Sequence, residues 1–182
     1  MKILLHICCA PCAIFPAETL LGKGHYVHGF FYNPNIHPYQ EFVKRVATLE
    51  KYAALTGLPV IWDRTYNLEE FFRAVVFREE ERCRFCYHRR LKAAARVARG
   101  GKFDAFTSTL LYSKFQNHEL IREMGQEVAR ELGLTFHYED FRVGWAEGAA
   151  QARNLGLYKQ QYCGCIFSER DRYLPTRNKN RT

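Results

Sequence analysis

The segment Leu4–Cys12 constrains the fold of this chain more than any other stretch. It opens with a mostly apolar run that is typical of a buried strand, and it ends in three closely spaced cysteines, Cys8, Cys9 and Cys12. Pro11 stands where a helix would begin, and proline suits the first helical turn because the N–H there has no partner anyway. A strand that leads directly into a helix is typical of α/β folds, whose ligands bind at the carboxyl ends of the strands. The segment therefore predicts a cysteine-lined site at the carboxyl end of strand one.

The remaining chain continues to alternate between strand-like and helix-like segments. Strands are expected at residues 2–7, 26–32, 60–63, 105–110 and 135–138, and helices at 11–21, 38–56, 67–77, 83–99, 117–132 and 147–154. Because such alternation forms right-handed βαβ units, it predicts an α/β fold with a mostly parallel sheet flanked by helices, of the Rossmann-like or HUP-like class. We expect one domain over residues 1–182, with a basic tail from about residue 169.

The cysteine count and the hydropathy pattern bear on the compartment. The chain has 7 cysteines, an odd number that cannot all pair internally. It shows no secretory leader pattern, and its apolar runs are too short to span a bilayer. We therefore expect a cytoplasmic protein without a membrane partner, in which thiols stay reduced. In that setting closely spaced cysteines indicate metal binding or redox chemistry more often than structural disulfides.

Positive charge is concentrated in one part of the chain. The net charge is +8, and residues Arg73–Lys102, here called the basic stripe, hold ten Lys or Arg against three acids. The tail adds Arg170, Arg172, Arg177, Lys179 and Arg181. Such a stripe favours a polyanionic partner such as nucleic acid, but a solvated basic surface explains the charge equally well.

A second cysteine pair, Cys83-x-x-Cys86, lies near an expected helix start. Two thiols at this spacing can point at one centre, and the helix dipole with Arg82 and Arg84 is expected to stabilise them as thiolates. Two of the three N-terminal cysteines would complete a four-thiolate site. An iron–sulfur cluster suits adjacent cysteines better than one small tetrahedral zinc ion, because its corners are separate. Zinc, or thiols without a metal, remain the alternatives.

The third cysteine group is Cys163-Gly164-Cys165. The glycine lets the backbone bend sharply between the two thiols. The pair either supplies two further metal ligands or forms a dithiol that cycles through a strained, easily reduced disulfide.

Polar residues gather where the expected strands end. They are Asn33, Asn35, His37, Thr107, Ser108, Thr109, Tyr112, Ser113, Gln116, Asn117, His118 and Asp140. Each one alone is explained as a cap or turn residue, but together they predict a substrate pocket beside the cysteines. The first strand–helix turn lacks the glycines of a phosphate-binding loop, so we do not expect a nucleotide there.

Seven motifs in order along the chain resemble one known family, the cobalamin-independent epoxyqueuosine reductase QueH. The motifs are Leu5–Cys12, Tyr32–Pro38, Arg82–Tyr87, Phe106–Leu111, Gln116–His118, Glu139–Arg142 and Gly156–Cys165. The resemblance covers residues 2–168 and leaves only the tail outside. It implies a catalytic domain that performs the last step of queuosine formation, the two-electron reduction of the epoxide of epoxyqueuosine at the wobble position of tRNA.

The resemblance also implies cofactors and residue roles. It implies a [4Fe-4S] cluster on Cys8, Cys9, Cys83 and Cys86, a second non-haem iron nearby, and no cobalamin. Cys163 and Cys165 would be a redox pair, and Cys12 either a ligand of the second iron or a thiol beside the cluster. The electron donor is not identified by the sequence.

The remaining roles follow from the chemistry of the implied reaction. The departing oxygen needs a proton or a Lewis acid, and Asp140, His118 and Tyr112 are the candidate donors. The basic stripe would bind phosphates through Arg89, Arg90 and Arg96, while Tyr32 or Tyr112 would stack on an unstacked base. Two other functions stay open: a zinc-stabilised RNA-binding module, and a metal-free thiol–disulfide oxidoreductase that uses Cys163 and Cys165 alone.

Overall fold

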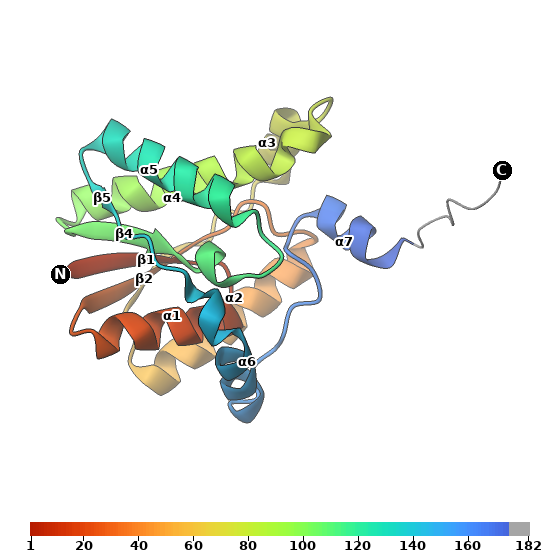
Figure 1. Cartoon of the computed structure of the whole chain (residues 1–182). Helices are drawn as coiled ribbons and strands as arrows, with labels where there is room; N and C mark the ends of the chain where they lie inside the picture. The colour runs from red at the N-terminus through yellow and green to blue at the C-terminus, as the bar shows by residue number, and fades with distance from the viewer. Residues whose placement is uncertain (175–182) are drawn as a thin grey trace.

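A computed structural model describes residues 1–174 of the chain (Figure 1). Its five strands form one parallel sheet in the order β3-β2-β1-β4-β5. The strands are β1 (Lys2–Ile7), β2 (Tyr26–Tyr32), β3 (Val60–Asp63), β4 (Ala105–Ser108) and β5 (Thr135–Phe136). The winding reverses between β1 and β4, which creates the crevice where sheets of this kind bind ligands. The expected α/β fold with a parallel sheet is confirmed.

Helices cover both faces of the sheet, with α1 and α2 on one face and α4 and α5 on the other (Figure 1). The helices are α1 (Ala10–Gly22), α2 (Tyr39–Thr56), α3 (Leu68–Val75), α4 (Arg82–Gly100), α5 (His118–Leu132), α6 (Trp145–Asn154) and α7 (Ile166–Tyr173). Three short 3₁₀ helices are η1 (Glu79–Glu81), η2 (Thr109–Tyr112) and η3 (Phe141–Gly144).

Strand β1 is the centre of the core. Its residues from Ile3 to Ile7 are fully buried, since β2 and β4 flank it and helices cover both faces. The one polar residue in that run, His6, is satisfied by both neighbouring strands. Its Nε2 donates to the Tyr32 carbonyl oxygen at 3.0 Å, and its Nδ1 accepts from the Ser108 hydroxyl at 2.9 Å. A buried polar group that is fully paired in this way fixes the ends of three strands relative to one another.

Several expected boundaries were wrong. The strand expected at 135–138 ends at Phe136, and the helix expected at 67–77 spans Leu68–Val75. The strand expected at 105–110 ends at Ser108, because the Ser108 hydroxyl accepts the backbone N–H of Leu110 and begins η2. The segment expected as a turn and a basic tail contains α7, and Arg170 and Arg172 lie on it. The tail positions Arg177, Lys179 and Arg181 lie outside the described residues. None of the helices within residues 1–174 is both long and apolar enough to cross a bilayer.

Candidate metal and substrate site

The three N-terminal cysteines converge at the carboxyl end of β1, as expected. The sulfur atoms of Cys8, Cys9 and Cys12 all lie within 4.8 Å of one another. Cys9 has an extended backbone and caps α1, and Pro11 lies in the first helical turn, which brings Cys12 back toward the strand end. The Thr109 side chain accepts from the Cys8 backbone N–H at 3.1 Å and lies 3.3 Å from the Cys8 sulfur. The residues of β1, α1 and η2 together therefore form a compact sulfur cluster.

The three thiols of this cluster differ in pKa. Hydrogen bonds from Cys12 and Cys9 hold the pKa of Cys8 well below its usual value. Burial raises the pKa of Cys9, and hydrogen bonding to Cys8 raises that of Cys12. Of the three thiols, Cys8 therefore loses its proton most readily.

All three cysteine groups meet at one cavity of about 690 Å³. Its lining includes the cysteines Cys8, Cys12, Cys83, Cys86, Cys163 and Cys165. Cys9 is 1% exposed and lies behind this lining. The topology explains why the cysteine groups lie together. One crevice is bordered by the ends of β1 and β2, the start of α4 and the 163–165 turn. A set of soft sulfur donors of this size is suited to iron or zinc.

Cys83 and Cys86 enter the cavity from the first turn of α4. Burial raises the pKa of both thiols, that of Cys86 to about 12. Arg82 lowers the pKa of Cys83 by less than burial raises it, and Arg84 is exposed. The expected lowering by Arg82 is present at Cys83, but desolvation outweighs it, so both thiols hold their protons more tightly than an exposed cysteine does.

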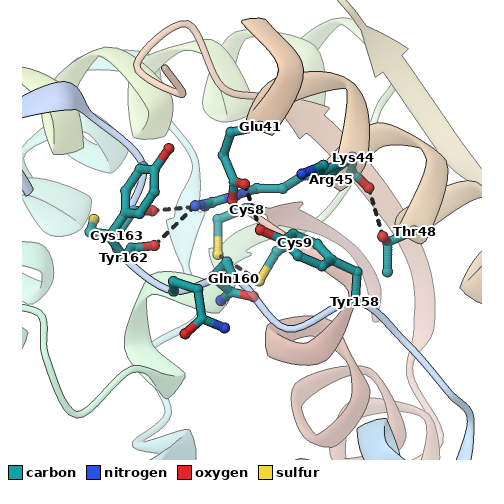
Figure 2. A network of polar contacts seen from close by, with 12 residues as sticks. Cys8, Cys9, Glu41, Lys44, Arg45, Thr48, Tyr158, Gln160, Tyr162 and Cys163 are labelled. Carbon is teal, nitrogen blue, oxygen red and sulfur yellow. Dashed lines mark hydrogen bonds and ion pairs between the residues drawn. The ribbon is translucent and has the colours of Figure 1, made fainter. Parts of the chain in front are cut away.

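A buried polar network holds the 163–165 turn against α2 (Figure 2). The Arg45 guanidinium donates to the carbonyl oxygens of Cys163 at 2.8 Å and Tyr162 at 2.9 Å. It also pairs with Glu41 at 2.7 Å, and Glu41 in turn accepts from the Tyr158 hydroxyl at 2.6 Å. Arg45 is 1% exposed and Glu41 6%. Since these five polar groups satisfy one another in a largely buried setting, the network is a rigid attachment for the cysteine turn.

The glycine of the turn is closely approached by neighbouring side chains. A Cβ on Gly164 would lie 3.2 Å from Asn35 Nδ2 and 3.3 Å from Ile36 Cγ1. The Gly164 carbonyl oxygen also accepts the backbone N–H of His37 at 2.8 Å. Gly164 therefore lets Cys163 and Cys165 sit close against the loop that follows β2. All seven cysteines are free thiols.

The polar residues expected at strand ends divide into two sets. Those that line the cavity are Asn35, Tyr112, Ser113 and Gln116. Others serve the fold: Asn33 donates to the Ile7 carbonyl oxygen at 2.9 Å, and Asn117 caps α5. The Oδ1 atom of Asn35 is buried without a hydrogen-bond partner in the described structure, which leaves an acceptor for a ligand.

The three candidate proton donors are in different surroundings. Tyr112 lines the cavity and donates to the Trp145 carbonyl oxygen at 3.1 Å. Arg142 lowers the pKa of Asp140 to about 2, so Asp140 is a carboxylate at neutral pH. His118 faces Tyr138, whose hydroxyl lies 3.1 Å from its Nε2. Asp140 and His118 are not among the described residues that line the cavity.

One part of the expected RNA surface was wrong. Arg90 is only 2% exposed, so it does not lie on an open face, whereas Tyr112, at 3% exposure, lies on the cavity wall. Arg89 is half-buried, pairing with Glu70 and donating to the Tyr32 hydroxyl. Arg96 is exposed, as expected. The basic stripe is therefore split between a solvent-facing part and a part that faces the cysteines.

Sequence reasoning missed three contributors to the site: Arg45, Glu41 and Gln160. Gln160 lines the cavity and its Nε2 lies 3.4 Å from the Cys12 sulfur. A signal for the other two was present, because Glu41 and Arg45 are one turn apart and directly precede Phe42 and Val46 of the apolar stripe of α2. An acid and an arginine at that spacing beside a buried stripe indicate a paired, buried salt bridge.

Comparison with known proteins decides the family. The family model described as epoxyqueuosine reductase QueH matches residues 3–171. This chain belongs to the QueH family. It is 36% identical over 172 residues to the epoxyqueuosine reductase QueH of Dehalococcoides mccartyi, an alignment that covers 94% of each chain. It is 33% identical to the Thermotoga maritima QueH over 175 residues, covering 91% of this chain and 89% of that one. The QueH family is one of reductases, so the chain is an oxidoreductase.

The cysteines present fit a metal site. The donor set is rich in sulfur, three of the sulfur atoms already lie together, and the remaining thiols line the same cavity. The cysteine cluster is therefore suited to bind a metal.

Proposed function

We propose that this chain reduces the epoxide of epoxyqueuosine in the anticodon of tRNA, giving queuosine. The observation that carries the proposal is the match to the QueH family over residues 3–171, with six cysteines lining one cavity. In the balanced reaction the epoxide takes up two electrons and two protons, both C–O bonds break, a carbon–carbon double bond forms and the oxygen leaves as water. We place the reaction in the cytoplasm, because the tRNA substrate is found in that compartment and thiols stay reduced in it.

The proposed cofactor is a [4Fe-4S] cluster on Cys8, Cys9, Cys83 and Cys86. When bound, the cluster would supply electrons singly, and a second non-haem iron beside Cys12 would assist loss of oxygen. No cobalamin is needed. In support, the sulfur atoms of Cys8 and Cys9 are already close, and Cys83 and Cys86 line the same cavity.

The roles proposed for the chain's own residues follow from where they lie. Cys163 and Cys165 act as a dithiol that gives or stores electrons, held at the cavity wall by Arg45. Tyr112 is the proposed proton donor, because the residue lines the cavity and burial raises its pKa, which keeps the proton in place until it is needed. We assign no direct proton transfer to Asp140 or His118, since both are engaged outside the cavity.

Substrate recognition is proposed for two surfaces. The exposed arginines of the basic stripe, Arg84, Arg96 and Arg99, would contact phosphates of the anticodon arm. Inside the cavity, the unpartnered acceptor of Asn35 would bind a hydroxyl or amino group of the modified base.

Conversion of tRNA that carries epoxyqueuosine, by protein purified without oxygen, tests the function. Queuosine formed in step with iron and sulfide content supports it. Protein that binds tRNA and contains zinc but no iron, with no conversion, would instead be a zinc-stabilised RNA-binding module. Full conversion by metal-free protein that depends on Cys163 and Cys165 would identify a thiol–disulfide oxidoreductase.

A further inference from the structure

Arg90 is a buried cation without a carboxylate partner. Its side chain donates to the carbonyl oxygen of Cys86 at 3.3 Å, to the sulfur of Cys86 at 2.9 Å and to Asn33 Oδ1 at 3.5 Å. No carboxylate among residues 1–174 lies within the 4.0 Å of an ion pair. The other deeply buried arginine, Arg45, has Glu41 at 2.7 Å.

Such an isolated charge is costly to bury. A guanidinium stays protonated in proteins, so it cannot lower the cost by losing its proton. Leaving one charge of a buried pair without its partner is strongly destabilising. The counter-charge must therefore come from groups that are neutral in the free side chain but ionised in the working protein. The thiols around Arg90 are such groups, because a thiol that binds a metal is deprotonated.

We propose that Arg90 is the fixed counter-charge of the thiolate-held metal centre and that it raises the reduction potential of that centre. The inference rests on the proposed function in that it requires a metal on the cysteines. Reduction adds one negative charge to the centre, and a guanidinium 2.9 Å from a ligand sulfur stabilises that added charge. Hydrogen bonds and charges beside the sulfurs are known determinants of iron–sulfur potentials. Arg90 is thus a positioning and tuning residue, not an RNA contact.

Three variants test the proposal. Arg90→Gln keeps hydrogen-bond donors but removes the charge, Arg90→Lys keeps the charge, and Arg96→Gln removes an exposed charge from the same helix as the control. Each is reconstituted anaerobically with iron and sulfide, and its midpoint potential is measured by redox titration followed by electron paramagnetic resonance. We expect a more negative potential in Arg90→Gln, a shift largely reversed in Arg90→Lys, and no shift in Arg96→Gln.

The contradicting results are distinct from failure of the proposed function. An iron-loaded parent whose potential equals that of Arg90→Gln overturns the Arg90 proposal alone, whereas a parent that binds no iron rejects the proposed cofactor. If Arg90→Gln does not hold iron, thermal unfolding of the metal-free proteins decides. Without the metal the buried charge lacks the thiolates that the metal would hold, so metal-free Arg90→Gln should melt no lower than the metal-free parent. A clearly lower melting temperature would make Arg90 a purely structural residue and overturn the proposal.

Discussion

Replacing Arg45 with methionine should destabilise the protein more than any comparable change on the surface of α2. The change removes the ion pair to Glu41 and the hydrogen bonds to the Tyr162 and Cys163 carbonyl oxygens. Glu41 stays buried at 6% exposure with only the Tyr158 hydroxyl as a partner. Removal of one member of a buried pair costs about 3–5 kcal/mol.

That loss is large relative to a typical total stability of about 5–15 kcal/mol. For a domain of this size it corresponds to a fall in melting temperature of roughly 6–20 °C. Urea unfolding of the metal-free protein measures it directly. The control is Lys44→Met, which removes the exposed neighbouring cation and should change stability by less than about 0.5 kcal/mol.

The double variant Glu41→Gln with Arg45→Met separates the buried charge from the lost hydrogen bonds. If the unpaired Glu41 carboxylate causes most of the loss, the double variant should be more stable than Arg45→Met alone. The thiol of Cys163 should also react faster with an alkylating agent in Arg45→Met, because the turn loses its attachment. A loss below about 1 kcal/mol, together with an unchanged alkylation rate, would refute a holding role for Arg45.

Three further predictions concern the thiols, the RNA surface and pH. Cys165→Ser should keep iron and tRNA binding but lose multiple-turnover reduction; loss of iron in step with activity would make the pair metal ligands. Replacing Arg84, Arg96 and Arg99 together with glutamine should flatten the dependence of log affinity for tRNA on log salt by about 2, and an unchanged slope would place them on an idle surface. Burial lowers the pKa of His37 to about 4 from 6.5, so the unfolded chain takes up a proton that the folded one resists. Stability should therefore fall as pH drops through this window, and His37→Gln should reduce that fall in urea unfolding; an equal fall in both proteins would contradict it.

The cysteine cluster at the end of β1 was predictable because local signals agreed. The apolar run, the three thiols and Pro11 together define a strand, a turn and a helix start, and the burial of β1 follows from its pattern. The convergence of Cys83 and Cys163 on the same cavity depended on topology, since only the reversal between β1 and β4 brings these distant segments together.

The misassigned arginine shows where sequence reasoning stops. Net charge placed Arg90 on an RNA surface, although helical spacing puts it beside Cys86, Leu91 and Ala94 on the buried face of α4. Composition describes a segment as a whole and does not distinguish the inner from the outer face of a helix. The short helix α7 was missed because its eight residues are mostly polar and carry no apolar stripe.

The most direct test of the central claim measures iron, sulfide and queuosine formation on one anaerobic preparation of the parent protein and of Cys83→Ala. We expect the parent to contain iron and sulfide and to convert tRNA that carries epoxyqueuosine. Cys83→Ala should lose most of the iron and all of the conversion, because one corner of the proposed cluster has no ligand. A Cys83→Ala protein with full iron, sulfide and activity would contradict the account.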